Sequence, residues 1–347
     1  KFVAVVKERD ESGIACLPVY YKSRIYIDLS DQTAYSDGFD KLLRWIYDKP
    51  LYKKPPLGAA PAFLVENGMS LSMATSSRFK RAIEAVKLNR ESAEVTVRDY
   101  FDSLVSQLEV LRIAGGKSEG EFDEQVVASI SAFLPYRNET IELIEAIAVY
   151  KDSPVMRRAL HRLFEGMIPY MESPRELTTY QEWDYDNYKF IIHELFLYCV
   201  AIFIRHERYE AAAYLMSTDF YHAGSSVYGQ DVMSSFPVMR QHIRALEHRN
   251  SRLKLNRLSV RADLLEERCK GVGIPFRDLL QADFVLFIRD HLDRPNERWH
   301  WYPETLLYIG RNPSPFEIFA RSRSANYFND VKRLFGISQK ADLIHLI

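Results

Sequence analysis

The chain has 347 residues and almost balanced charge, with 46 Lys and Arg residues against 47 Asp and Glu residues. A formal net charge of −1 excludes a global field that would favour nucleic acid or an acidic membrane surface. The length predicts more than one domain, or one large helical body. The three cysteines, Cys16, Cys199 and Cys269, form no C-x-x-C pair, which argues for a reducing compartment and against a structural zinc site.

The first segment alternates short apolar runs with polar turns. Phe2 to Val6 is an apolar run typical of a strand buried on both faces, and residues 16–29 hold a second β-branched and aromatic stretch. Apolar residues then recur at helical spacing from Phe39 to Ile46, with Asp37 as the expected N-cap. Two strands and a helix cannot bury enough apolar surface alone, so we expect further residues of this domain before Lys1.

These elements resemble the C-terminal half of a bacterial Toll/interleukin-1 receptor (TIR) domain. The resemblance is carried by the strand KFVAVV, the turn Ala15-Cys16-Leu17-Pro18, the strand end Ile27-Asp28-Leu29 and the helix from Phe39 to Tyr47. It covers residues 1–48 and implies a flavodoxin-like α/β fold for the domain to which they belong.

For function, the resemblance implies either cleavage of NAD⁺ or homotypic assembly. In enzymatic members a glutamate on a helix in the first half of the domain acts where the glycosidic bond breaks, and a carboxylate there stabilises the positive charge that develops on the sugar. That helix would lie before Lys1, so no residue of this chain is expected to be catalytic. NAD⁺ is thus implied as a substrate, and no permanently bound cofactor is expected.

A proline-rich linker is predicted over residues 49–68, because Lys49 to Pro61 contains four prolines. Beyond it the pattern is helical, with a helical region over 69–175 and an aromatic-rich helical bundle over 176–347. The run from Phe190 to Ile204 is apolar nearly all round, which predicts a helix at the centre of the bundle. It is shorter than the ~20 residues that a membrane span needs.

Helix boundaries are predicted from capping residues. Ser153-Pro154 has the N-cap and N1 arrangement of a helix start, and Thr96 with Asp99 resembles a capping box. One long helix is expected from Val238 to Leu258. Further helices are expected from Ser259 to Cys269, from Pro275 to Leu292 and from Ala325 to Phe335 before Gly336.

Residues 240–261 hold seven basic residues against the single acid Glu247. Along a helix, such a stripe could follow a phosphate backbone, with Arg249, Arg252 and Arg257 at its centre. The alternative, which we favour, is an interdomain or subunit surface that faces a nearby acidic run. That run consists of Glu172, Glu176, Glu182, Asp184 and Asp186.

The segment 290–302, DHLDRPNERWHWY, has the most unusual local composition of the chain. Exposed Arg294, Trp299 and Trp301 would form a recognition surface, because Trp and Arg dominate binding hot spots. The favoured alternative is a loop whose tryptophans fill the core of the bundle.

Two further patterns are weaker signals of chemistry. Gly115-Gly116-Lys117 follows a predicted helix and lacks the full P-loop spacing, so a helix C-cap is favoured over a phosphate site. His193-Glu194 lacks the H-E-x-x-H spacing of a zinc site, so both residues are expected to be buried and hydrogen-bonded rather than metal ligands.

The sequence therefore predicts a mainly α protein in which the second half of a TIR domain precedes a large helical bundle. We expect a cytoplasmic effector of bacterial antiphage-type defence that cleaves NAD⁺, while the helical part senses a trigger or drives assembly. The expected partner is a second copy or another component of the defence system; nucleic acid is not favoured, and no membrane is expected. The alternatives are a non-enzymatic TIR scaffold and a helical nucleic-acid sensor.

Overall fold

The computed structural model describes residues 3–18, 26–31, 35–47, 75–113, 121–173, 181–221, 233–311 and 314–346. The chain divides into two compact units, Lys1–Ser70 and Leu71–Ile347. The predicted linker at 49–68 and the Gly115-Gly116 C-cap lie outside the described residues.

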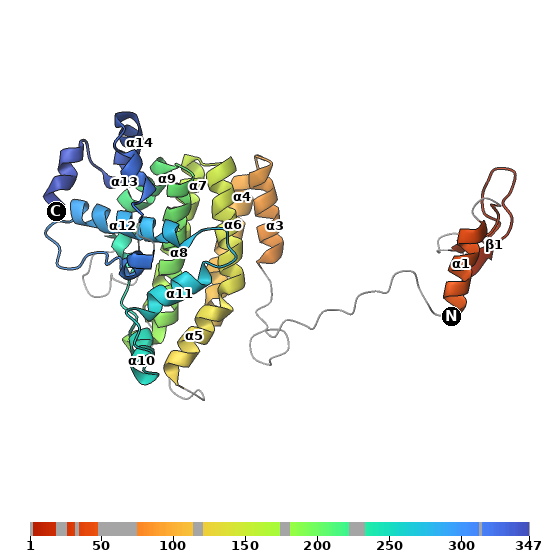
Figure 1. Ribbon diagram of the computed structural model, residues 1–347, viewed down its shortest axis with the longest axis horizontal. Helices are drawn as coiled ribbons and strands as arrows, with labels where there is room; N and C mark the ends of the chain where they lie inside the picture. The colour runs from red at the N-terminus through yellow and green to blue at the C-terminus, as the bar shows by residue number, and fades with distance from the viewer. Residues whose placement is uncertain are drawn as a thin grey trace. The chain divides into compact units, whose positions relative to one another are not determined.

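The described residues of the first unit form two short strands and one helix, in the predicted order (Figure 1). The N-cap predicted at Asp37 is wrong, because the helix begins at Tyr35 and Asp37 lies in its first turn. β1 (Ala4–Val6) and β2 (Tyr26–Asp28) pair in parallel, with Val5 opposite Ile27. α1 (Tyr35–Ile46) follows and contacts β2. A Cβ on Gly38 would collide with the backbone oxygen of Asp28, so glycine lets α1 approach the strand closely.

Asp28, at the end of β2, organises the polar side of this unit. Its carboxylate accepts hydrogen bonds from the hydroxyl and backbone amide of Ser30, at 2.6 and 2.9 Å, and pairs with Arg9. These bonds from Ser30, together with the one from Arg9, lower the pKa of Asp28 to about 2. The carboxylate therefore stays ionised at neutral pH and ties the loop after β1 to the end of β2.

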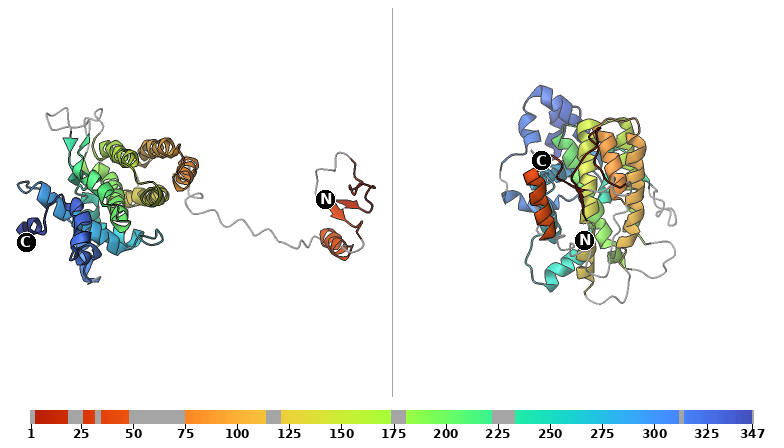
Figure 2. Two further views of the ribbon diagram at one scale, coloured as in Figure 1. Left: turned by 90° about the horizontal axis from the view of Figure 1, so that it is seen from above. Right: turned by 90° about the vertical axis from the view of Figure 1, so that its right-hand side faces the viewer.

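The second unit is helical. Four helices lie side by side, because α3 contacts α4 and α6 while α4 contacts α7 (Figures 1 and 2). Their bounds are α3 Ser76–Lys87, α4 Ala93–Gln107, α6 Leu134–Tyr150 and α7 Pro154–Met167, with α5 (Phe122–Ala132) between α4 and α6 in the chain. The cap predicted at Ser153 is confirmed, since its hydroxyl accepts the amide of Met156. The capping box predicted at Thr96 is wrong, because α4 begins three residues earlier at Ala93 and the Thr96 hydroxyl bonds back to Ser92.

The predicted central helix is confirmed as α8 (Asp186–Arg205). Every residue from Asp186 to Ile204 is buried, and α8 packs against α5, α6, α7 and α12. Among the described residues, one stretch, Trp183–Arg205, is long and apolar enough to cross a membrane, but its apolar 18-residue window is entirely buried inside this core.

Of the remaining helices, α9 and α12 pack directly against α8, and the others pack on its neighbours. The helices are α9 Tyr209–Ser217, α10 Arg244–Arg252, α11 Val260–Arg268, α12 Phe276–Asp293, α13 Glu317–Arg321 and α14 Ala325–Phe335. β3 (Phe220–Tyr221) and β4 (Met233–Ser234) form a small antiparallel pair. The 3₁₀ turns are η2 Leu108–Leu111, η3 Ile168–Met171, η4 Glu182–Tyr185, η6 Phe236–Met239, η7 Glu304–Arg311 and η8 Lys340–Leu346. One hydrophobic core runs from Ala82 to Phe335, so the boundary predicted at 175/176 falls inside a single core.

The long helix predicted from Val238 to Leu258 is wrong. Only α10 forms there, because residues 240–243 are not helical and the chain leaves the helix after Arg252. Lys254 and Asn256 adopt left-handed backbone angles, with φ of 51° and 52°. The side chain of Asn250 closes this loop by bonding both the amide and the carbonyl of Arg257. The helices predicted at 259–269, 275–292 and 325–335 are confirmed as α11, α12 and α14.

Candidate functional site

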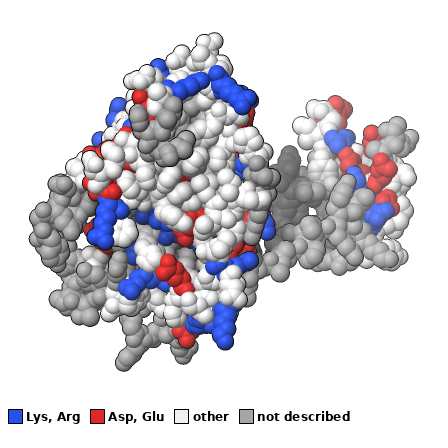
Figure 3. Space-filling view, turned by 60° about the vertical axis from the view of Figure 1, so that its left-hand side comes forward, with Lys and Arg blue, Asp and Glu red and all other residues white. Residues whose placement is uncertain are grey.

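Five of the seven basic residues in the predicted stripe form ion pairs within the described part of the chain. Arg249 and Arg252 on α10 both pair with Asp123 and Glu124 at the start of α5, and Arg252 donates to Asp123 at 3.1 and 2.7 Å. Arg257 pairs with Asp263 at 3.0 Å. Arg249 and Arg252 therefore hold α10 against α5, and Arg257 ties the loop after α10 to α11. The acids that Arg249 and Arg252 bind are not those of the run at 172–186. On the face in Figure 3, positive and negative side chains are interspersed rather than gathered by sign.

The α5–α10 contact should make stability depend on pH through Asp123. Burial alone would raise the pKa of Asp123, but the hydrogen bonds and charge of Arg252 hold it below its ordinary value. Because the pKa of Asp123 is lower in the folded chain than in the unfolded chain, its carboxylate stabilises the fold at pH values above the unfolded pKa of about 3.9. This stabilisation is lost as the pH falls through the pKa that Asp123 has in the folded chain. We expect Asp123→Asn to lower the free energy of unfolding by about 1–3 kcal/mol at pH 7 and by much less at pH 3.

Urea unfolding at the two pH values measures this difference. Asp99→Asn is the control, because Asp99 is half exposed where it pairs with Arg78, and a surface pair of this kind contributes about 1 kcal/mol at most. An Asp123→Asn effect of the same size at pH 3 and pH 7 would contradict the assignment.

In the segment 290–302, one tryptophan fills the core and the other lies on the surface, so each of the two predicted interpretations holds for one of them. Trp301 is buried and Trp299 is 78% exposed. The indole of Trp301 donates to Asp283 at 2.6 Å, and its backbone amide donates to Asp290 at 2.6 Å. Arg294 also donates to Asp290, at 2.6 Å, so Arg294 braces the loop. Trp301 thus fills the core as the favoured interpretation predicts, and Trp299 remains on the surface.

His193 and Glu194 are both buried, as predicted, but only Glu194 is hydrogen-bonded through its side chain to another described residue. Glu194 is fully buried and accepts two parallel hydrogen bonds from Arg268, at 2.7 and 2.8 Å, with Arg137 at 3.4 Å. The prediction that His193 is hydrogen-bonded is wrong, because within the described part of the chain neither ring nitrogen has a partner. Burial and the nearby charges of Arg261 and Arg240 hold its pKa well below the ordinary value, so this histidine is neutral.

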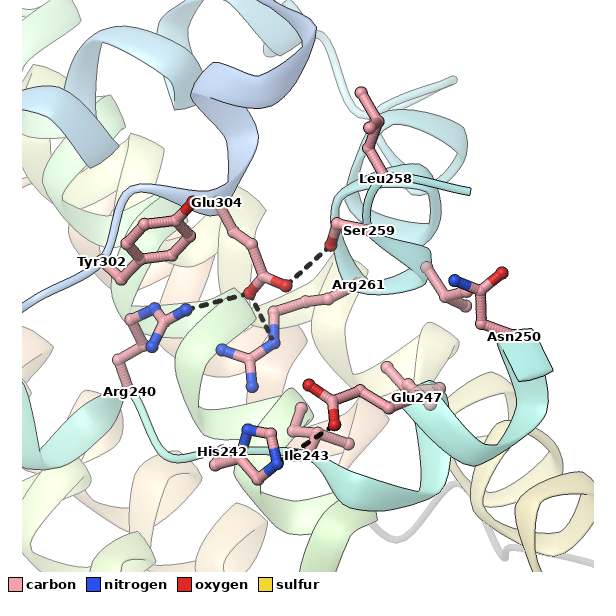
Figure 4. A pocket seen from close by; sticks show the side chains of 12 residues that line it. Arg240, His242, Ile243, Glu247, Asn250, Leu258, Ser259, Arg261, Tyr302 and Glu304 are labelled. Atoms are coloured by element: carbon pink, nitrogen blue, oxygen red, sulfur yellow. Dashed lines mark hydrogen bonds and ion pairs between the residues drawn. The ribbon is translucent and has the colours of Figure 1, made fainter. Parts of the chain in front are cut away.

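A cavity of about 280 Å³ opens close to these arginines and is lined mainly by polar atoms (Figure 4). Its walls come from the segment after η6, from α10, from the start of α11 and from the segment that leads into η7. The lining residues are Arg240, His242, Ile243, Leu246, Glu247, Asn250, Leu258, Ser259, Val260, Arg261, Tyr302 and Glu304.

Glu304 is the anchor of the cavity wall. One of its carboxylate oxygens accepts from Arg240 at 3.0 Å and lies 3.3 Å from Nε of Arg261, and the other accepts from the Ser259 hydroxyl at 2.8 Å. Ser259 also caps α11 by accepting the amide of Ala262, so the cap and the cavity share a side chain. Although burial would raise it, the two arginines hold the pKa of Glu304 below its ordinary value.

Sequence reasoning places Arg240 and Arg261 in the basic stripe but does not connect them to Glu304. Their connection requires Glu304 to return to α11 from more than 40 residues along the chain. The sequence offers one signal for this site, which is that Glu304 is the first acid after the aromatic segment Trp299-His300-Trp301-Tyr302.

Among the described residues, no group of three or more His, Cys, Asp or Glu side chains is arranged to hold a metal ion. The arrangement in the cavity instead suits hydrogen bonding to an acceptor-rich group, because two lining arginines, Arg240 and Arg261, each have a buried nitrogen without a hydrogen-bond partner. Comparisons with protein-family models, with curated proteins and with solved structures found no match for this chain.

Proposed function

We propose that this chain belongs to a TIR-type effector of bacterial antiphage-type defence that cleaves NAD⁺ when activated. In this proposal residues 1–48 are the C-terminal half of the TIR domain, and the helical unit senses a trigger or drives assembly. The observation that carries the proposal is the parallel pairing of β1 with β2, followed directly by α1.

Parallel pairing supports this proposal for a physical reason. A parallel strand pair is characteristic of α/β sheets whose faces are covered by helices, and two strands alone are at best marginally stable. Val6 and Ile27 are buried in this pair although each strand has only three residues. A larger sheet of the flavodoxin-like kind would use such a pair as one side, as the resemblance to TIR domains implies.

The proposed chemistry is hydrolysis of the bond between nicotinamide and ribose, with NAD⁺ as substrate and no resident cofactor. The glutamate that the resemblance implies would precede Lys1, so the residues of this chain would complete the fold around it and not perform the chemical step. Cys16, Cys199 and Cys269 are free thiols, which supports a cytoplasmic site of action.

The test is NAD⁺ consumption by the natural polypeptide that contains this chain, over a range of concentrations that changes its assembly state. We expect NAD⁺ loss that rises with assembly and that disappears when the upstream glutamate is replaced by Gln. The chain Lys1–Ile347 alone is the matched control and should not consume NAD⁺. Absence of NAD⁺ loss in every assembly state would remove the enzymatic proposal.

A second candidate is a non-enzymatic TIR scaffold, and one specific observation favours it. α1 exposes apolar side chains on one face, since positions spaced by three and four residues share a side of a helix. They are Tyr35, Phe39, Leu43, Ile46 and, just beyond the helix, Tyr47. If this face joins two copies, Ile46→Ser should reduce the mass measured by light scattering at high concentration. A scaffold would show this effect without NAD⁺ consumption in any state.

A further inference from the structure

Two arginines lie in the wall of the cavity beside Glu304. Arg240 and Arg261 share the single carboxylate of Glu304. The remaining ionisable pair in the wall, His242 with Glu247 at 3.3 Å, is well exposed and is therefore screened by water. Two guanidinium groups therefore meet one carboxylate in the wall, and the further negative charges that act on Arg261 belong to Asp283 and Asp186, which do not line the cavity.

Burial makes the charge of Arg261 costly. Arg261 is 4% exposed, and desolvation lowers its pKa to about 10, although Glu304, Asp283 and Asp186 oppose the shift and Arg240 adds to it. A depressed pKa for an arginine means that its charged form is under-compensated, and an anion bound beside it would restore the balance.

Unpaired donors point to the same place. Nε of Arg240 and Nη1 of Arg261 are buried and have no hydrogen-bond partner. Among the described residues that line this cavity, these two nitrogens are the buried side-chain atoms that lack a hydrogen-bond partner. Buried donors without acceptors are rare in folded proteins, so two of them at one cavity mark a missing acceptor.

The close view shows how these groups are arranged (Figure 4). The guanidinium of Arg261 extends between Glu304 and His242 and towards Arg240. The free nitrogens are not exposed to water in this conformation, so a ligand reaches them when a guanidinium group turns within the cavity. Arg240 can do so most easily, because its side chain is 15% exposed and rests on the ring of Tyr302.

We propose that this cavity binds a small phosphorylated ligand through Arg240 and Arg261. A phosphoryl group has several acceptor oxygens in a tetrahedral arrangement, so one group can accept from two arginines that approach from different elements. A volume of about 280 Å³ is at the low end for small-molecule sites, which fits a phosphate ester of modest size and not a polymer.

Binding of the ligand does not depend on the proposed function. Only the consequence of binding, a response to a trigger, rests on the proposed sensing role of the helical unit. The ligand would connect α10, α11 and the segment before η7, all of which contribute to the cavity wall. Binding can be measured without NAD⁺, so the two proposals fail separately: NAD⁺ loss without phosphate binding removes this inference alone, and phosphate binding without NAD⁺ loss removes the enzymatic proposal alone.

The experiment is isothermal titration of the whole chain with inorganic phosphate and, separately, with acetate at matched ionic strength. We expect saturable binding of phosphate at one site per chain and no saturable binding of acetate. Arg261→Gln and Arg240→Gln should each weaken phosphate binding about tenfold or more, as loss of a charge-assisted hydrogen bond does. Arg249→Gln is the matched control, because Arg249 pairs with Glu124 and does not line the cavity.

Arg240→Gln keeps the test decisive if Arg261→Gln does not fold, since Arg240 is the less buried of the two. Three results would overturn the proposal. They are no saturable phosphate binding by the unmodified chain, equal binding of acetate, and phosphate affinity in Arg240→Gln that matches that of Arg249→Gln.

Discussion

Replacing Glu194 by Ala is expected to lower the free energy of unfolding by about 3–5 kcal/mol, because it leaves buried positive charge without its partner. Glu194 is fully buried on α8 and receives two parallel hydrogen bonds from Arg268. Arg137, which is 1% exposed, also faces this carboxylate. Without Glu194, the guanidinium groups of Arg137 and Arg268 would repel each other in a space that water does not reach.

Equilibrium unfolding in urea at pH 7 measures this effect, with Glu142→Ala as the control. Glu142 pairs with Lys87 at 3.4 Å on the surface, where both side chains are about half exposed. Removing a pair of that kind changes stability by about 1 kcal/mol at most. If the two variants lost equal stability, Glu194 would not be the counter-ion of a buried cluster.

Replacing Trp301 by Ala should lower the free energy of unfolding by about 3–5 kcal/mol, the range for removing a large buried aromatic side chain. Its ring lies against Phe196, Phe236 and His193, with ring centroids 5.4 to 6.1 Å away. The substitution would also take one donor from the buried carboxylate of Asp283. Both the cavity and the lost hydrogen bond contribute to the expected effect.

Trp299 supplies an unusually close control, since it is the same residue type two positions earlier. It is 78% exposed, with Arg298 over its ring, so Trp299→Ala should change stability by no more than about 0.5 kcal/mol. Urea unfolding of both variants, followed by circular dichroism, compares them on one scale. A large loss in Trp299→Ala, or a negligible one in Trp301→Ala, would contradict the division of the loop into a core tryptophan and a surface tryptophan.

Elements with strong local signals were predictable from the sequence. α8 is apolar on all sides, and that pattern alone identifies it as the central helix of the bundle. α14 ends where Gly336 adopts a left-handed conformation, with φ of 65°, as a glycine after an apolar helical repeat predicts. The start of α7 at Ser153-Pro154 follows from capping chemistry in the same way.

The errors occur where particular side-chain contacts, rather than the apolar pattern, decide the structure. The periodicity of residues 238–258 predicts a continuous helix, but Asn250 bonds the backbone of Arg257 and closes a loop instead. The acids that neutralise Arg249 and Arg252 lie more than 120 residues away on α5, and no local pattern connects them. For the same reason the cavity could not be predicted, because Glu304 meets Arg240 and Arg261 only through the fold.

Whether residues 1–48 belong to a larger parallel sheet, as a TIR-type effector requires, is tested most directly by amide hydrogen exchange at β1 and β2. In the natural polypeptide that contains this chain, these amides should exchange almost as slowly as those of α8, because a strand pair within a larger sheet opens only with its domain. In the chain Lys1–Ile347 alone they should exchange quickly, since two strands are marginally stable. Equal exchange rates in the two proteins would contradict the assignment of this segment to a TIR domain.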